Sequence, residues 1–142
     1  THVNGPNFAE ALRRKPAGKF MAVDFLHLRE YAVLEQYPGA IDIAYFGGTS
    51  DMADELLRLS RKTASLLVLT LGAEGSIAFR GGISCTQPAL PLDKVIDTTG
   101  CGDAFQAGFT SEYLKSGDIP AALLAGAELG RLAASSFGGV PW

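Results

Sequence analysis

Apolar residues gather in short runs that alternate with segments of helical spacing. The runs occupy residues 20–25, 41–46 and 65–70, and the stretch from 52 to 60 repeats its leucines at helical intervals. Strands that alternate with helices usually pair in parallel, are buried on both faces and bind ligands at their carboxyl ends. The pattern therefore predicts an α/β fold with a mostly parallel sheet.

The pattern changes in the second half of the chain. Residues 76–80 and 83–86 are apolar runs on either side of a Gly-Gly pair, which predicts an antiparallel hairpin at an edge of the sheet. From about Gly102, two alanine-rich helical segments follow, separated by Ser-Gly-Asp-Ile-Pro at 116–120. Because glycine ends helices and aspartate with proline begins them, this break predicts two consecutive helices.

Composition narrows the class of protein. The chain has 142 residues, 47% hydrophobic and 19% charged, as expected for one globular domain. A net charge of −3 gives no basic stripe for nucleic acid, and no apolar run approaches the roughly 20 residues that span a bilayer. The two cysteines fit neither a disulfide framework nor zinc-site spacing, so we expect a cytoplasmic protein without nucleic-acid or membrane partners.

A glycine-rich turn before the first of these helices carries the candidate chemistry. Residues 95–105 read Val-Ile-Asp-Thr-Thr-Gly-Cys-Gly-Asp-Ala-Phe. Free N–H groups at a helix start attract phosphate, so Gly100, Cys101 and Gly102 are a candidate anion hole. Asp103 beside them is a candidate general base that takes the proton of an attacking hydroxyl, as phosphoryl transfer to an alcohol requires. The same features also fit an ordinary helix start, where the dipole alone favours an acid.

Two segments resemble one enzyme family. Residues 97–105 closely resemble the second signature of the ribokinase-like, or phosphofructokinase-B-like, carbohydrate kinases, with Cys101 where alanine is usual. Residues 68–76 resemble the strand and turn that contact ATP in that family. The resemblance implies a three-layer α/β/α fold and ATP-dependent phosphorylation of a hydroxyl on a sugar or sugar derivative. The positions that it assigns to nucleotide binding, which on their own fit a plain turn, are Thr70, Gly72 and Gly75.

The resemblance extends over residues 1–142 but corresponds only to the C-terminal, ATP-binding part of such a kinase. The N-terminal half, which supplies the sugar pocket and the lid, is expected in cis or in trans. We therefore expect residues 1–142 alone to lack kinase activity and to self-associate, for example as a homodimer, or to pair with the other half. The pattern looks most like the fructoselysine 6-kinase branch, while fructose, ribose and nucleosides stay open as substrates. The alternative is a non-catalytic nucleotide-binding or interaction module derived from such a kinase.

The resemblance also implies cation sites. The family carries Asn-x-x-Glu after the strand matching residues 41–46, and here only the acid is present, as Asp51. By the resemblance, Asp51 holds magnesium through water. Alternatively, it is an ordinary acid at a helix start. Asp97 matches a monovalent-cation position, for which potassium is the expected ion, with Thr99 as a partner. An Asx turn to Thr99 explains Asp97 equally well. The carbonyls implied as further partners are those near Ala134, Phe137 and Gly139.

Four further residues invite a functional interpretation. A helix N-terminus can lower the pKa of the Cys101 thiol, although we interpret Cys101 as a small packing residue. His27 follows the first strand and is expected in a loop. Phe105 and Phe109 lie one helical turn apart and are expected in the core.

Overall fold

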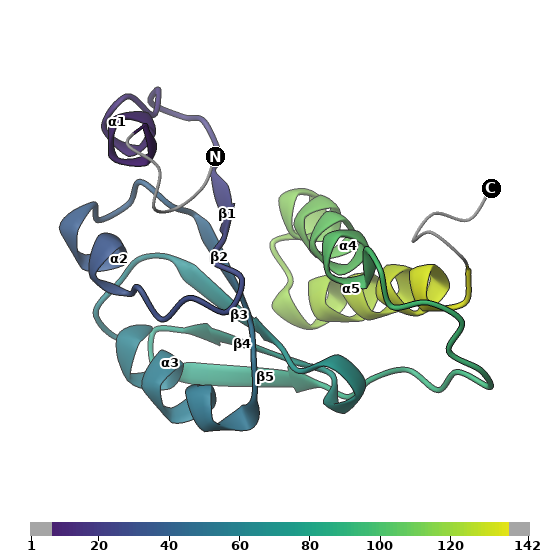
Figure 1. The fold of residues 1–142 in the computed structure, drawn as a ribbon. Helices are drawn as coiled ribbons and strands as arrows, with labels where there is room; N and C mark the ends of the chain where they lie inside the picture. Colours follow the sequence, from purple (N-terminus) through teal and green to yellow (C-terminus); the bar gives the residue numbers. More distant parts are fainter. Residues whose placement is uncertain (1–6, 137–142) are drawn as a thin grey trace. The chain divides into compact units, whose positions relative to one another are not determined.

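Strands and helices alternate as expected in the computed structural model, which describes residues 7–136 (Figure 1). Five strands form one sheet in the order β1-β2-β3-β4-β5. The chain divides into two compact units. The N-terminal unit combines residues 1–69 with 79–84, and the C-terminal unit combines residues 70–78 with 85–142.

The N-terminal unit has a parallel arrangement of strands. Its elements are α1 (Phe8–Arg13), β1 (Ala22–Asp24), α2 (Ala32–Gln36), β2 (Ile43–Gly47), the 3-10 helix η1 (Ser50–Met52), α3 (Ala53–Leu59) and β3 (Leu66–Thr70). β1 pairs in parallel with β2, with Val23 opposite Ala44. The N–H of Leu66 donates to the carbonyl of Asp42 at 2.9 Å, so β2 and β3 begin side by side and run in the same direction. The predicted parallel strands are confirmed.

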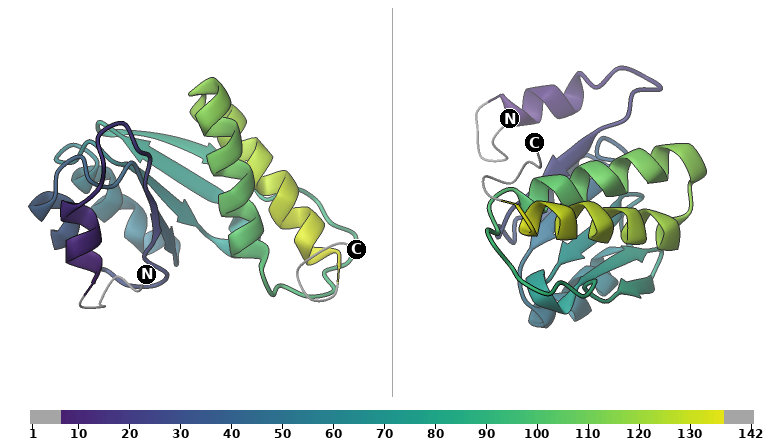
Figure 2. Two further views of the ribbon diagram at one scale, coloured as in Figure 1. Left: turned by 90° about the horizontal axis from the view of Figure 1, so that it is seen from above. Right: turned by 90° about the vertical axis from the view of Figure 1, so that its right-hand side faces the viewer.

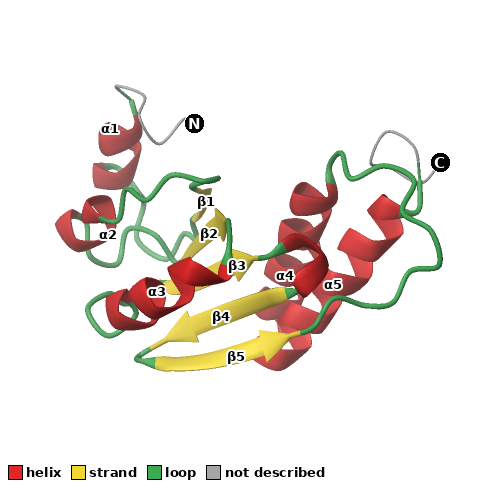
Figure 3. Ribbon diagram, turned by 60° about the horizontal axis from the view of Figure 1, so that its bottom comes forward, coloured by secondary structure: helices red, strands yellow, loops and turns green. Residues whose placement is uncertain are grey.

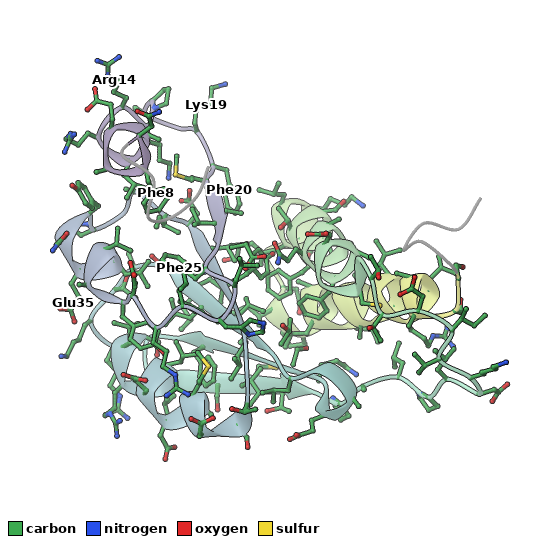
Figure 4. The ribbon with its side chains drawn as sticks, in the orientation of Figure 1. Phe8, Arg14, Lys19, Phe20, Phe25 and Glu35 are labelled. Atoms are coloured by element: carbon green, nitrogen blue, oxygen red, sulfur yellow. The ribbon has the colours of Figure 1, made fainter. Side chains whose placement is uncertain are left out.

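The core of this unit follows from the apolar runs. Four consecutive residues of β2 and of β3 are buried, as expected for strands covered on both faces. Phe8 on α1 points toward the body of the unit and is only 5% exposed, whereas Arg14 points away from it (Figure 4).

The first strand is shorter than the sequence suggested. Hydrogen bonding in register with β2 defines it as residues 22–24, and Phe20 is left 39% exposed. Phe25 follows the strand and is fully buried, with its ring stacked 5.0 Å from that of Phe46. The apolar run is therefore longer than the strand, because its last residue, Phe25, packs in the core without belonging to the strand.

The predicted hairpin is confirmed. β4 (Ser76–Arg80) and β5 (Ile83–Gln87) are neighbours in the sheet, and Figure 3 shows their arrows in opposite directions. Gly81 and Gly82 connect them with φ of 60° and 82°. Two consecutive positive φ angles are the geometry of the tight turn that matches strand twist, and glycine adopts it without a steric penalty.

Two long helices close the C-terminal unit. They are α4 (Cys101–Ser116) and α5 (Ile119–Ala134), and Figure 2 shows them side by side. Gly117 ends α4 with φ 68°, and the Asp118 carboxylate caps α5 by accepting the N–H of Ala121 at 2.9 Å. The predicted break between the helices is confirmed.

Glycines let these two helices touch. A Cβ atom on Gly108 would lie 2.6 Å from the carbonyl oxygen of Ala125, and one on Gly126 would lie 2.8 Å from the ring of Phe105. Phe105 and Phe109 are both buried, which confirms them as core residues. No helix in the described residues 7–136 is long and apolar enough to cross a membrane.

Candidate functional site

The candidate anion hole lies at the start of α4. Gly100 precedes the helix with φ 76°, a left-handed conformation that glycine favours. The N–H of Cys101 donates to Thr98 at 3.2 Å, and that of Ala104 donates to Gly100 at 2.9 Å. Between them, the N–H groups of Gly102 and Asp103 reach no backbone acceptor within residues 7–136. Two backbone donors therefore remain available at the positive end of a 16-residue helix.

The surroundings of this helix start are open. A Cβ atom built on Gly102 would meet nothing within 4 Å. Asp103, in the first turn, is exposed and forms no ion pair with another described residue. An incoming group can therefore approach the N–H groups and the carboxylate together.

Asp97 forms the Asx turn that was the alternative to a cation site. Its Oδ1 accepts the N–H of Thr99 at 2.9 Å. The N–H groups of Ile96 and Asp97 donate to the carbonyl of Ala134 at 2.9 and 3.4 Å, so the end of α5 lies against the segment that leads into α4. Asp97, Thr99 and Ala134 are thus brought together, while the other two expected partners, Phe137 and Gly139, lie outside the described residues. In residues 7–136, no group of three or more His, Cys, Asp or Glu side chains is placed to hold a metal ion.

The Cys101 thiol is not activated. Burial and the nearby Asp97 carboxylate raise its pKa above the ordinary value. The lowering of the pKa considered from the sequence is therefore wrong, because burial and a negative neighbour outweigh the helix N-terminus. The result favours the interpretation of Cys101 as a small packing residue.

The two glycines of the candidate nucleotide loop differ in what surrounds them. Thr70 ends β3, and Gly72 opens the 3-10 helix η2 (Gly72–Glu74) with φ 59°. A Cβ atom added to Gly72 would meet nothing within 4 Å. Gly75 has φ 104°, and a Cβ there would lie 2.2 Å from the carbonyl oxygen of Gln87. Gly75 is therefore required by the fold, whereas Gly72 is free to face a ligand. Both glycines and the start of α4 belong to the C-terminal unit.

Asp51 belongs to the N-terminal unit and is already engaged. Its Oδ2 lies 2.5 Å from Arg29 Nη2, and its Oδ1 accepts the hydroxyl of Thr49. These hydrogen bonds, from Thr49 first and then Arg29, lower the pKa of the Asp51 carboxyl group. Arg29 also lies 3.9 Å from Glu55 through Nη1 and Oε2.

Arg29 was not foreseen from the sequence, because its partner is 22 residues away. The sequence signal for Arg29 is its position in the segment after β1. Ligand sites of parallel sheets lie at the carboxyl ends of the strands, so a basic residue there is a candidate site residue. Nearby, Tyr31 has its pKa raised to about 12 by burial and by Glu55. His27 is exposed, with Nδ1 2.7 Å from the carbonyl oxygen of Gly47, and is a loop residue as expected.

Comparisons with known proteins identify the family of this chain. Residues 42–141 match the family model described as pfkB family carbohydrate kinase. The fructoselysine 6-kinase of Escherichia coli is 34% identical over 115 residues, which cover 78% of this chain and 43% of that enzyme.

Solved structures show the same fold. A microbiome-derived acarbose kinase has a TM-score of 0.78 at 24% identity and matches 96% of this chain and 49% of its own. The ribokinase of Arabidopsis thaliana, solved with ribose and ATP, has a TM-score of 0.74 at 22% identity over 92% of this chain and 47% of its own. The fold is ribokinase-like, and the chain spans about half the length of the relatives that it matches.

Proposed function

This chain belongs to the pfkB family of carbohydrate kinases, and we propose that within its full-length protein it transfers the terminal phosphoryl group of ATP to a hydroxyl of a sugar or sugar derivative. The observation that carries the proposal is the open start of α4. There, two unpaired N–H groups and the exposed Asp103 carboxylate stand in the first turn of one helix.

The proposed chemistry needs both features. The Asp103 carboxylate accepts the proton of the attacking hydroxyl, whose oxygen forms a bond to the γ-phosphorus while the bond from that phosphorus to the bridging oxygen of ADP breaks. The free N–H groups at the start of α4 stabilise the negative charge on the transferred phosphoryl oxygens. Magnesium, which accompanies ATP in kinases, neutralises charge on the phosphates when it is bound.

The nucleotide loop is the second part of the proposal. Thr70 ends β3 and Gly72 lies in the turn that follows, both in the same compact unit as α4, and Gly72 has open space beside it. The ribokinase of Arabidopsis thaliana was solved with ATP, and the sequence resemblance assigns Thr70 and Gly72 to nucleotide binding. Gly75 supports the site indirectly, because its packing against residues 87–89 holds the turn in shape.

We propose fructoselysine as the first substrate to test, because the relative at 34% identity is a fructoselysine 6-kinase. The match covers 43% of that enzyme, so residues outside this chain contribute to the choice of sugar. We also propose that residues 1–142 expressed alone lack sugar kinase activity, and that the rest of the kinase, in cis or in trans, restores it.

The test is release of ADP by the full-length protein with fructoselysine, fructose, ribose and a nucleoside as acceptors. Sugar-dependent release supports the kinase, and the acceptor with the highest kcat/KM names the substrate class. Binding of ATP without release for any of the four acceptors would contradict the proposal.

A second candidate, a nucleotide-binding module without catalysis, is favoured by one observation. Asp51, the acid expected to order magnesium, is engaged by Arg29 and Thr49. Titration calorimetry with ATP, run beside the ADP assay, separates the two functions: the module binds ATP but never turns it over.

A further inference from the structure

Each oxygen of the Asp51 carboxylate is bonded by another residue of its own chain. Arg29 contacts one oxygen at 2.5 Å, and the Thr49 hydroxyl donates to the other. Arg29 reaches Glu55 as well, at 3.9 Å. A single guanidinium group thus connects the segment after β1 with Asp51 in η1 and with Glu55 in the first turn of α3.

Magnesium makes demands that this arrangement does not meet. It takes six oxygen ligands in a regular octahedron, keeps several waters, and is usually bound by one or two carboxylates together with substrate phosphates. A cation at Asp51 would have to share its oxygens with an arginine and a hydroxyl that already bond to them, and it would lie beside the positive charge of Arg29. No group of metal-binding side chains exists in residues 7–136 to compensate for these contacts. The residues present therefore do not fit a magnesium site.

We propose that Arg29 takes the place of a cation at this helix start, and that the ion pair with Asp51 and Glu55 keeps a divalent cation out. A carboxylate cluster without an arginine would attract a divalent cation, whereas with Arg29 the negative charge of Asp51 is balanced within the chain. The divalent-ion requirement of the kinase then does not depend on Asp51. Arg29 is a positioning residue here, not a catalytic one.

The ion pair is expected to affect the binding of a divalent cation rather than the free energy of unfolding. Arg29 and Asp51 are 50% and 59% exposed, and exposed ion pairs contribute little to folding because water and salt screen them. A dissolved cation, however, has to compete with a guanidinium that the same chain always holds nearby. The inference rests on the proposed kinase function in one respect, because that function is the reason to expect magnesium near Asp51.

The test measures Mn²⁺ bound by the nucleotide-free, full-length protein, by electron paramagnetic resonance of the free ion. The variants are Arg29→Gln, Asp51→Asn, the double variant, and Asp54→Asn as a control that removes a neighbouring acid from the first turn of α3 without touching the ion pair. Circular dichroism melting shows that each is folded, and Arg29→Met, which also removes the positive charge, replaces Arg29→Gln if that variant is not. No turnover is needed, so the result is independent of the kinase assay.

We expect Asp51→Asn and Asp54→Asn to bind Mn²⁺ as wild type does. Arg29→Gln should bind it about tenfold more tightly, on the scale by which neighbouring groups tune metal sites, and the double variant should lose that gain. Unchanged Mn²⁺ binding in Arg29→Gln would overturn the proposal. So would wild-type Mn²⁺ binding that falls by about 10- to 100-fold in Asp51→Asn but not in Asp54→Asn.

Discussion

The starts of η1 and α4 have similar residues, but their aspartates have different surroundings. Residues 48–51 and 100–103 each begin with glycine and end with aspartate at the start of a helix. At the first, Asp51 is held by Arg29 and Thr49. At the second, Asp103 is exposed beside two N–H groups that reach no backbone acceptor within residues 7–136. An acid after a glycine turn is therefore not a functional signal by itself, and what the rest of the chain places around it decides its role.

The glycines of the two starts differ in the same way. A Cβ atom on Gly48 would lie 2.3 Å from the sulfur of Met52, which is 2% exposed, whereas one on Gly102 would meet nothing within 4 Å. At position 48, the buried Met52 side chain leaves no room for a larger residue than glycine. The space beside Gly102 is open. Substitutions at matching positions of the two helix starts test this comparison.

The largest effect is expected from exchanging the two aspartates for asparagine. Asp103→Asn should lower kcat by about 100-fold or more, because the general base is lost, while ATP affinity changes little. Asp51→Asn should leave kcat within about twofold of wild type, since no step passes through it. Steady-state kinetics of the full-length protein measure both, and more than a tenth of wild-type turnover in Asp103→Asn would remove it as the base.

The two glycines should respond in opposite ways to alanine. Gly48→Ala should cost about 1–3 kcal/mol of unfolding free energy, because its methyl group overlaps a buried methionine. Gly102→Ala should fold at least as stably as wild type, since alanine favours helices, yet bind ATP more weakly because the methyl group enters the anion hole. Urea unfolding and ATP calorimetry separate the two outcomes. Equal ATP affinity in Gly102→Ala would argue against a phosphate there.

The residues that precede the helices give a smaller contrast. Gly100 has φ 76°, so Gly100→Ala should cost about 1–2 kcal/mol, and Gly100→Asn less, because asparagine tolerates this conformation. Thr49 has an extended backbone with φ −122°, so Thr49→Gly should cost only a few tenths of a kcal/mol. Urea unfolding tests the ranking, and an equal loss at both positions would show that backbone conformation does not distinguish the two starts.

The smallest effect concerns the pKa of Asp51. Its folded-state pKa is lowered, so the associated stability is present above the ordinary pKa and is lost as the pH falls through the folded-state value. Thr49→Ala removes the hydroxyl hydrogen bond and should move the pKa of Asp51 back toward the ordinary value. Carboxyl NMR titration measures the pKa of Asp51, and no change in Thr49→Ala would contradict the hydrogen bond.

Much of the fold was readable from the sequence because its signals are local. Apolar runs predicted the strands, the Gly-Gly pair predicted the hairpin, and Gly117 with Asp118 predicted the boundary between α4 and α5. Each of these signals works through φ preferences or hydrogen bonds between residues only a few positions apart. The Asx turn of Asp97 was foreseen as an alternative for the same reason.

Contacts between distant residues decided the rest. The sequence by itself determined the α/β class, the family resemblance and the candidate residues around Asp103. Only the tertiary structure placed Arg29 on Asp51 and Gln87 against Gly75, and left the Cys101 thiol partly buried. Burial and charge act through space, so which acid is neutralised, which glycine is packed and which thiol is disfavoured as an anion depend on neighbours that the local sequence does not name.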